Sequence, residues 1–349
     1  MFLLMGGVEA LIMRVQLARP NATVLTPEQY NQLFTMHGVT MIFLYALPVL
    51  SGFSNYLWPL VLGARDMAFP RLNALSYWIF LFAGIFLFAS FPTGQAPDAG
   101  WFNYTPLSGL EYSTGPNIDV YALGMVLLGI STTVGSMNFV VTLLRMRAPG
   151  MSLDRVPVLV WGTLTASAGN LLAVPSVSLA FFLLWLDRRI GTHFFDVLNG
   201  GRPLFWQHLF WIFAHPWVYA VVLPAMSIVS DALPVFCRRP LVGYGPVALA
   251  TVATMAIGFV VWIHHMFATG IPAPAVPTSL KPRTAPAATL PRRASRAREP
   301  SPRRRRRSRA ASAWARRSAP SIRRTSRRIR PRVLAVTATT ISRGRCAKA

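Results

Sequence analysis

Long runs of apolar residues with almost no charge constrain the fold of this chain more than any other feature. Such a run is long enough to match the roughly 20 residues that a helix needs to cross the hydrocarbon core of a bilayer. Backbone polar groups in lipid must be hydrogen-bonded within the protein, so these runs are expected to form helices. The sequence therefore predicts an all-α, polytopic membrane helix bundle and excludes a soluble domain. The full runs lie at about 32–62, 73–92, 119–144, 157–186, 204–236 and 242–268.

The first sixteen residues form a shorter apolar segment, interrupted only by Glu9 and Arg14. The segment is too short for a full span, and it lacks the basic start and the cleavage site of a signal peptide. We interpret it as the second half of a helix whose beginning is missing. The sequence thus predicts one incomplete and six whole spans.

Composition divides the chain near residue 270. The net charge is +24, but residues 1–270 hold twelve Arg against ten acidic residues, while the remainder holds 23 basic residues against one Glu. An Arg-, Pro- and Ala-rich segment cannot bury enough apolar surface to fold, so 271–349 is predicted to be disordered. A polybasic tail can bind anionic lipid or nucleic acid. We prefer to interpret the tail as the product of a shifted reading frame in GC-rich coding DNA, which yields the same Arg-, Ala-, Pro- and Ser-rich composition. We therefore expect no nucleic-acid partner.

The arginines in the short loops predict the orientation of the bundle. Seven lie in the loops 63–72, 145–156 and 237–241, and the positive-inside rule places these loops on the inner side. Four, at positions 19, 188, 189 and 202, remain on the outer side. In this orientation all the candidate histidines lie in the outer half of the bilayer. The aromatic residues at 101, 104 and 112 are expected at the outer membrane interface.

Histidines inside apolar runs are the strongest candidates for a site, because an imidazole in lipid is costly unless it is ligated or hydrogen-bonded. A lone membrane histidine is more often a packing residue. Here His215 shares a helix face with Tyr219, four residues later, and His264 and His265 close the last apolar run. Three imidazoles suit copper, zinc or iron. His208 and His193 are interpreted as a structural residue and a surface turn residue.

Six motifs occur in one order along these predicted helices and loops. Together they resemble subunit I of the haem-copper oxygen reductases, of the cytochrome c oxidase type. The resemblance covers residues 1 to about 270. It implies a subunit of twelve spans, of which this chain matches the first seven. The motifs are TMHG at 35–38, GARDMAFPRLN at 63–73, MRAPGM at 146–151, QHLFW at 207–211, HPWVY at 215–219 and WIHHMF at 262–267.

The resemblance implies roles for individual residues. His37 matches an axial ligand of the low-spin haem, and Arg14 an arginine that hydrogen-bonds a haem substituent. Tyr219 matches a tyrosine crosslinked to the first copper histidine, and Trp211 a residue that packs beside the active site. For Arg14 and Trp211, a snorkelling charge and ordinary packing remain equally good interpretations. The implied copper ligands are His215, His264 and His265.

Proton delivery is where the sequence departs from the pattern. The family has a glutamate two residues after the first copper histidine, and here Trp217 occupies that position. Some members of the family have instead a Tyr-Ser pair just before this histidine. That pair is also absent, since Phe213 and Ala214 precede His215. Either another group relays protons, or the protein uses the family's second channel, which lies in its later spans. The inner-side path itself is expected to be interrupted or vestigial. The residues that match its mouth are Asp66, Asn55, Asn73 and Asn138.

The implied function is that of a terminal respiratory oxidase. Electrons would pass through the low-spin haem to a centre of high-spin haem and copper, reducing O2 to water with proton translocation. Expected partners are subunits II and III, cytochrome c or quinol, O2 and the lipid bilayer, in a bacterial inner (plasma) membrane. A quinol oxidase remains an alternative. So does a catalytically inactive membrane fragment, because the family carries the high-spin haem ligand on a later helix.

Overall fold

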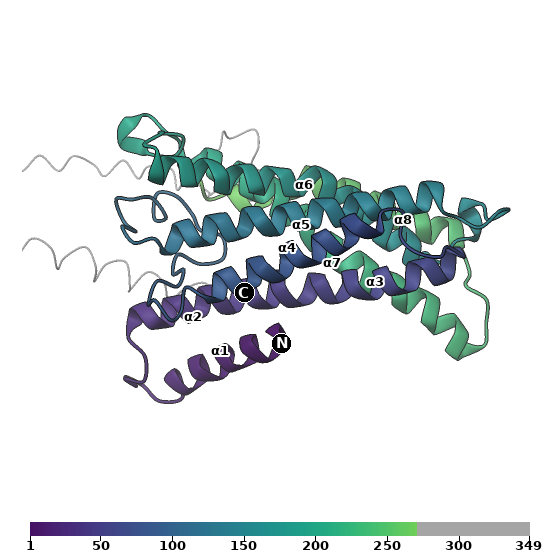
Figure 1. Cartoon of the computed structure of the whole chain (residues 1–349), viewed down its shortest axis with the longest axis horizontal. Coiled ribbons are helices and arrows are strands. Elements are labelled where there is room, and N and C mark those ends of the chain that lie inside the picture. The colour runs from purple at the N-terminus through teal and green to yellow at the C-terminus, as the bar shows by residue number, and fades with distance from the viewer. Residues whose placement is uncertain (271–349) are drawn as a thin grey trace, which may run out of the picture. The chain divides into compact units, whose positions relative to one another are not determined.

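The computed structural model describes residues 1–270, and the regular secondary structure of this part is entirely helical. The segment predicted to be disordered, 271–349, lies outside the described residues. Figure 1 shows the long helices lying side by side. They are α1 (Phe2–Gln16), α2 (Pro27–Val39), α3 (Leu47–Leu62), α4 (Pro70–Phe88), α5 (Asn117–Arg145), α6 (Val158–Arg189), α7 (Pro203–Cys237) and α8 (Tyr244–Val261).

Six helical segments in this part are long and apolar enough to cross a membrane, which confirms the predicted all-α membrane bundle. They are Pro27–Leu62, Pro70–Phe88, Asn117–Arg145, Val158–Arg189, Pro203–Cys237 and Tyr244–Met266. Helix α1, with 15 residues, is shorter than a span, as expected for 1–16. The chain is therefore a multi-pass membrane protein.

Two helix boundaries differ from the apolar runs by more than three residues. The first long span begins at Pro27 rather than near 32, because Thr26 and Gln29 form a capping box that supports a polar first turn. The next one ends at Phe88 rather than at 92. There the Ser90 hydroxyl donates a hydrogen bond to the carbonyl of Leu87, and Pro92 cannot continue a helix.

The long connections gather at the two ends of the bundle. Segments 89–116 and 190–202 lie at one end, which we call the outer end after the predicted orientation (Figure 1, left). Segments 63–69, 146–157 and 238–243 lie at the opposite end, which we call the inner end. Helix α6 packs against α5, α7 and α8, so it positions both helices that carry the candidate metal ligands.

A π-helical segment, η1 (Thr40–Ala46), joins α2 to α3 without a break. Pro48 lies two residues after its end, and a proline ring clashes with the carbonyl four residues earlier in a regular α-helix. The wider π turn accommodates that ring, and such turns are frequent at functional sites. The sequence analysis did not predict this segment.

A buried arginine fixes the outer loop to the bundle. Arg188 of α6 donates to Asp119 of α5 at 2.8 Å and to the backbone carbonyls of Ser108, Ser113 and Gly115. Its side chain is 1% exposed, whereas that of Arg189, which pairs with the other oxygen of Asp119, is 50% exposed. Arg188 thereby holds segment 89–116 against α5 and α6.

We expect Arg188→Ala to destabilise the protein far more than Arg189→Ala. Removing one partner of a buried pair costs about 3–5 kcal/mol, whereas an exposed pair contributes about 1 kcal/mol or less. Thermal unfolding of the two purified variants in the same detergent measures the difference as a shift in midpoint. Equal shifts of the unfolding midpoint for both variants would show that Arg188 does not hold segment 89–116 in place.

Candidate functional site

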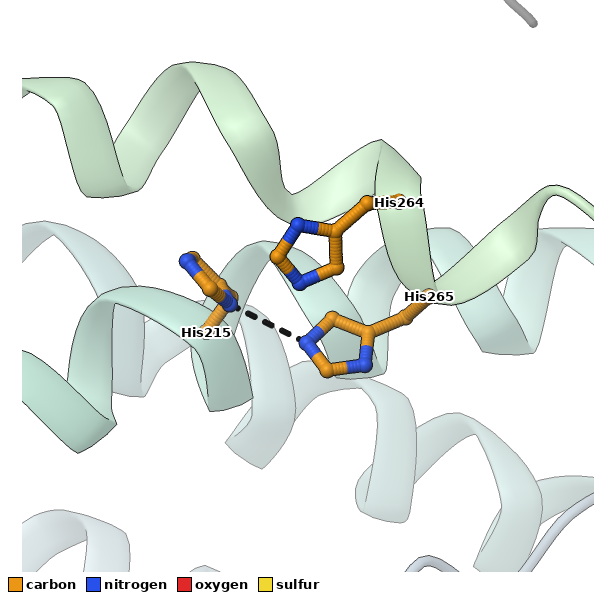
Figure 2. A group of neighbouring side chains, drawn as sticks. All are labelled: His215, His264 and His265. Carbon is orange, nitrogen blue, oxygen red and sulfur yellow. Dashed lines mark hydrogen bonds between the residues drawn. The ribbon is translucent and has the colours of Figure 1, made fainter. Parts of the chain in front are cut away.

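Three histidine side chains from distant parts of the sequence converge in the bundle. His215 comes from α7, and His264 and His265 come from the 3-10 helix η4 (Trp262–Met266) at the end of α8. One ring nitrogen from each lies within 4.8 Å of the other two, and Figure 2 shows the rings facing one another. The predicted convergence of these three residues is present in the structure.

The orientation of the His215 ring assigns a different partner to each nitrogen. Nδ1 lies 3.0 Å from Nε2 of His265, and Nε2 lies 3.2 Å from the hydroxyl of Tyr219. The rings of His215 and His264 meet edge to face, with centroids 4.4 Å apart. Neutral imidazoles offer lone pairs, and a cation between them can bind all three. The donor set and its spacing fit a copper or zinc ion.

Tyr219 of α7 reaches this position because the facing residue of α8 is a glycine, Gly258, which has no side chain. A Cβ atom at Gly258 would lie 2.6 Å from Cδ2 of Tyr219, so even alanine would displace the ring. Helical spacing predicted that Tyr219 and His215 share a face, and the structure agrees. The requirement for Gly258 was missed, since a glycine in an apolar run carries no signal of what approaches it.

Trp211 lies on the outer side of the same group. Its indole ring stacks on His265, with centroids 3.7 Å apart and planes 5° apart, and its Nε1 donates to the hydroxyl of Tyr104. Burial raises the pKa of Tyr104, so this hydroxyl stays protonated at neutral pH. Tyr104 was expected only as an interfacial aromatic, and its contact with Trp211 adds it to the surroundings of the histidines.

His37 lies apart from the three-histidine group, on α2. Its Nδ1 donates a hydrogen bond of 2.9 Å to the backbone carbonyl of Gly6 in α1, since a carbonyl oxygen can only accept. Nε2 is then unprotonated and can ligate a metal. A Cβ atom at Gly6 would lie 2.7 Å from the sulfur of Met41, so glycine allows the close approach of α1. Arg14 is exposed near the C-terminal end of α1.

The four residues predicted for the proton path fall into two groups. Asn55 and Asn73 line a cavity of about 380 Å³, to which η1 and helices α3 to α7 contribute residues. Asn138 lies outside it, and its amide pairs with the backbone N–H and carbonyl of Phe69. Asp66 is exposed, and its carboxylate accepts from the backbone N–H of Met67. Asn138 therefore holds the loop that carries Asp66.

Comparison with known proteins identifies the family of this chain. The sequence matches the family described as cytochrome C and quinol oxidase polypeptide I over residues 1–279. It is 48% identical over 270 residues to cytochrome c oxidase subunit 1 of Bacillus subtilis, and 47% identical to that of Bacillus sp. strain PS3. Cytochrome c oxidase subunit 1 of Corynebacterium efficiens is 44% identical.

Each of these alignments covers 77% of this chain but only 43%, 44% and 46% of the respective relative. The chain thus spans less than half the length of these curated relatives. Within that part it carries the converging histidines, Tyr219 and the hydrogen-bonded His37 described above. With the family matched over residues 1–279, the chain belongs to the cytochrome c and quinol oxidase polypeptide I family.

Proposed function

We propose that this chain forms the first part of a haem-copper oxidase subunit I that takes part in reducing O2 to water. The observation that carries the proposal is the arrangement around His215, whose two ring nitrogens have different partners. One faces the other two histidines and the other faces Tyr219. A packing histidine is satisfied by one donor and one acceptor partner, whereas here two further imidazoles lie within 4.8 Å, a spacing at which one cation can bind all three.

Copper is the metal that we assign to this group. His215 would hold it through Nδ1, and His264 and His265 would complete a set of three imidazole ligands. Bound copper supplies one-electron redox chemistry. The chain itself places the Tyr219 hydroxyl, a group able to give up a proton, 3.2 Å from Nε2 of His215. Trp211 packs flat on His265 and restricts the orientation of that ring.

We assign His37 as an axial ligand of a low-spin haem. The hydrogen bond from Nδ1 to the Gly6 carbonyl fixes the tautomer and the ring orientation that an iron ligand needs. Arg14 remains a proposed partner of a haem substituent. The second axial ligand and the high-spin haem ligand are expected from later helices of the family. Oxygen reduction, proton translocation and pumping are thus proposed for the assembled enzyme.

Partners and location follow from the same family. We propose that the chain works with subunits II and III, in a bacterial plasma membrane, and receives electrons from cytochrome c. A quinol oxidase remains the alternative, because the family name includes both donors. A dinuclear copper site in the accompanying subunit II would favour cytochrome c. An inactive membrane fragment is the other alternative, and it predicts a chain that binds neither haem nor copper.

His215→Ala should abolish copper binding by the full chain. Losing one of three ligands is expected to lower copper affinity by more than about 100-fold, since even outer-shell changes cost 10–100-fold. Copper per chain is measured by mass spectrometry after purification from copper-supplemented cells. His208→Ala is the matched control, because it removes another histidine from α7. Copper retained by the His215 variant at the control level would refute the assignment.

His37→Ala should remove the bound haem of the chain while leaving its copper content unchanged, because His37 lies apart from the three-histidine group. The amount of haem bound per purified chain reports the loss. His193→Ala, in the loop between α6 and α7, provides the control. An unchanged haem spectrum in the His37 variant would show that another residue ligates the iron.

A further inference from the structure

The cavity that contains Asn55 and Asn73 has the properties of a hydrated compartment. Its walls carry the hydroxyl and amide groups of Ser54, Ser76 and Asn170 among others. The side-chain oxygens of Asn55 and Asn170 are buried and have no hydrogen-bond partner within the described part of the chain. Buried polar atoms are normally satisfied, and about 380 Å³ is far more than the roughly 30 Å³ that one water occupies. Ordered water is the partner that fits these atoms.

One face of α7 shows where this compartment ends. Ala220 and Pro224 line the cavity, and Trp217 occupies the next turn of the same face toward the outer end, followed by Phe213. Trp217 is 4% exposed, and its ring lies 5.0 Å from Phe43 and 5.8 Å from Phe213, centroid to centroid. Phe43 itself lines the cavity. Phe43 therefore forms part of the outer wall, and the rings of Trp217 and Phe213 stack behind it.

These rings offer almost nothing to which water can bind. Phenylalanine has no hydrogen-bonding side-chain atom, and an indole has a single N–H donor and no acceptor. The stack contains no titratable group that could pass a proton onward. His215 lies two residues before Trp217, about 200° around the helix, so it faces a different side of α7. The polar walls stop short of the three-histidine group.

We propose that Phe43 and Trp217 form a hydrophobic seal that closes a water-filled cavity at its outer end and separates it from the three-histidine centre. The π-helical segment η1 supplies Phe43, and α7 supplies Trp217. What the seal does rests on the proposed function: protons that enter this cavity from the inner side do not reach the centre by this path. The centre then receives its protons by another path.

Radiolytic footprinting of the purified full chain tests the seal without haem, copper or turnover. Hydroxyl radicals formed from bound water oxidise adjacent side chains, and peptide mass spectrometry measures the rate at each residue. Phe139 lines the cavity and is 4% exposed, whereas Phe181 is 0% exposed and lies outside it. We expect Phe139 to be oxidised severalfold faster than Phe181. Equal slow rates would show a dry cavity and overturn the proposal.

Phe213, 2% exposed, reports on the far side of the seal. It should be protected like Phe181 in the unaltered chain and in Trp217→Phe, which keeps an apolar ring. In Trp217→Glu its oxidation should rise severalfold toward the rate of Phe139. Rapid oxidation of Phe213 in the unaltered chain or in Trp217→Phe would overturn the seal. These outcomes are independent of the copper and haem assignments, which the metal and haem contents test separately.

Discussion

Hydrocarbon offers no hydrogen-bond partner, and this constraint explains how the key polar groups of the bundle are paired. Asp231 of α7 accepts from the backbone N–H groups of Val158 and Leu159. Its carboxylate thus caps the start of α6, and these N–H groups need no water as a partner. At the outer end, Arg188 is satisfied by one carboxylate and three carbonyls. His215 obeys the same rule through His265 and Tyr219. Asp231 and Arg188 are thus paired within the protein, whereas the converging imidazoles have lone pairs to offer a metal.

Hydropathy predicted the spans because the length and apolarity of a membrane helix are local properties of the sequence. The convergence of His215, His264 and His265 was also predictable, although from the family's motifs rather than from spacing alone. Gly258 and Tyr104 were not, since their importance lies in the approach of α8 and of the outer loop to Tyr219 and Trp211. The π segment Thr40–Ala46 was missed because hydropathy does not distinguish helix types.

The predicted proton path shows how one set of residues can have two physical roles. Asn55 and Asn73 line the cavity, while Asn138 acts on the backbone of Phe69 and fixes the loop that carries Asp66. The spacing of asparagines in a sequence does not separate these roles. Trp217 was recognised from the sequence as a departure from the family, and the structure adds its aromatic neighbour Phe43. Under our proposal, the inner half of the molecule is organised around water and the outer half around the histidines.

The central claim is that three imidazoles of this chain form a copper centre. X-ray absorption at the copper edge tests it most directly, because scattering from the imidazole ring identifies both the type and the number of ligands. For the copper-loaded full chain, we predict a first shell with three imidazole nitrogens, falling to two at most in His265→Ala. A first shell dominated by sulfur or by water oxygen, or one unchanged in that variant, would contradict the account.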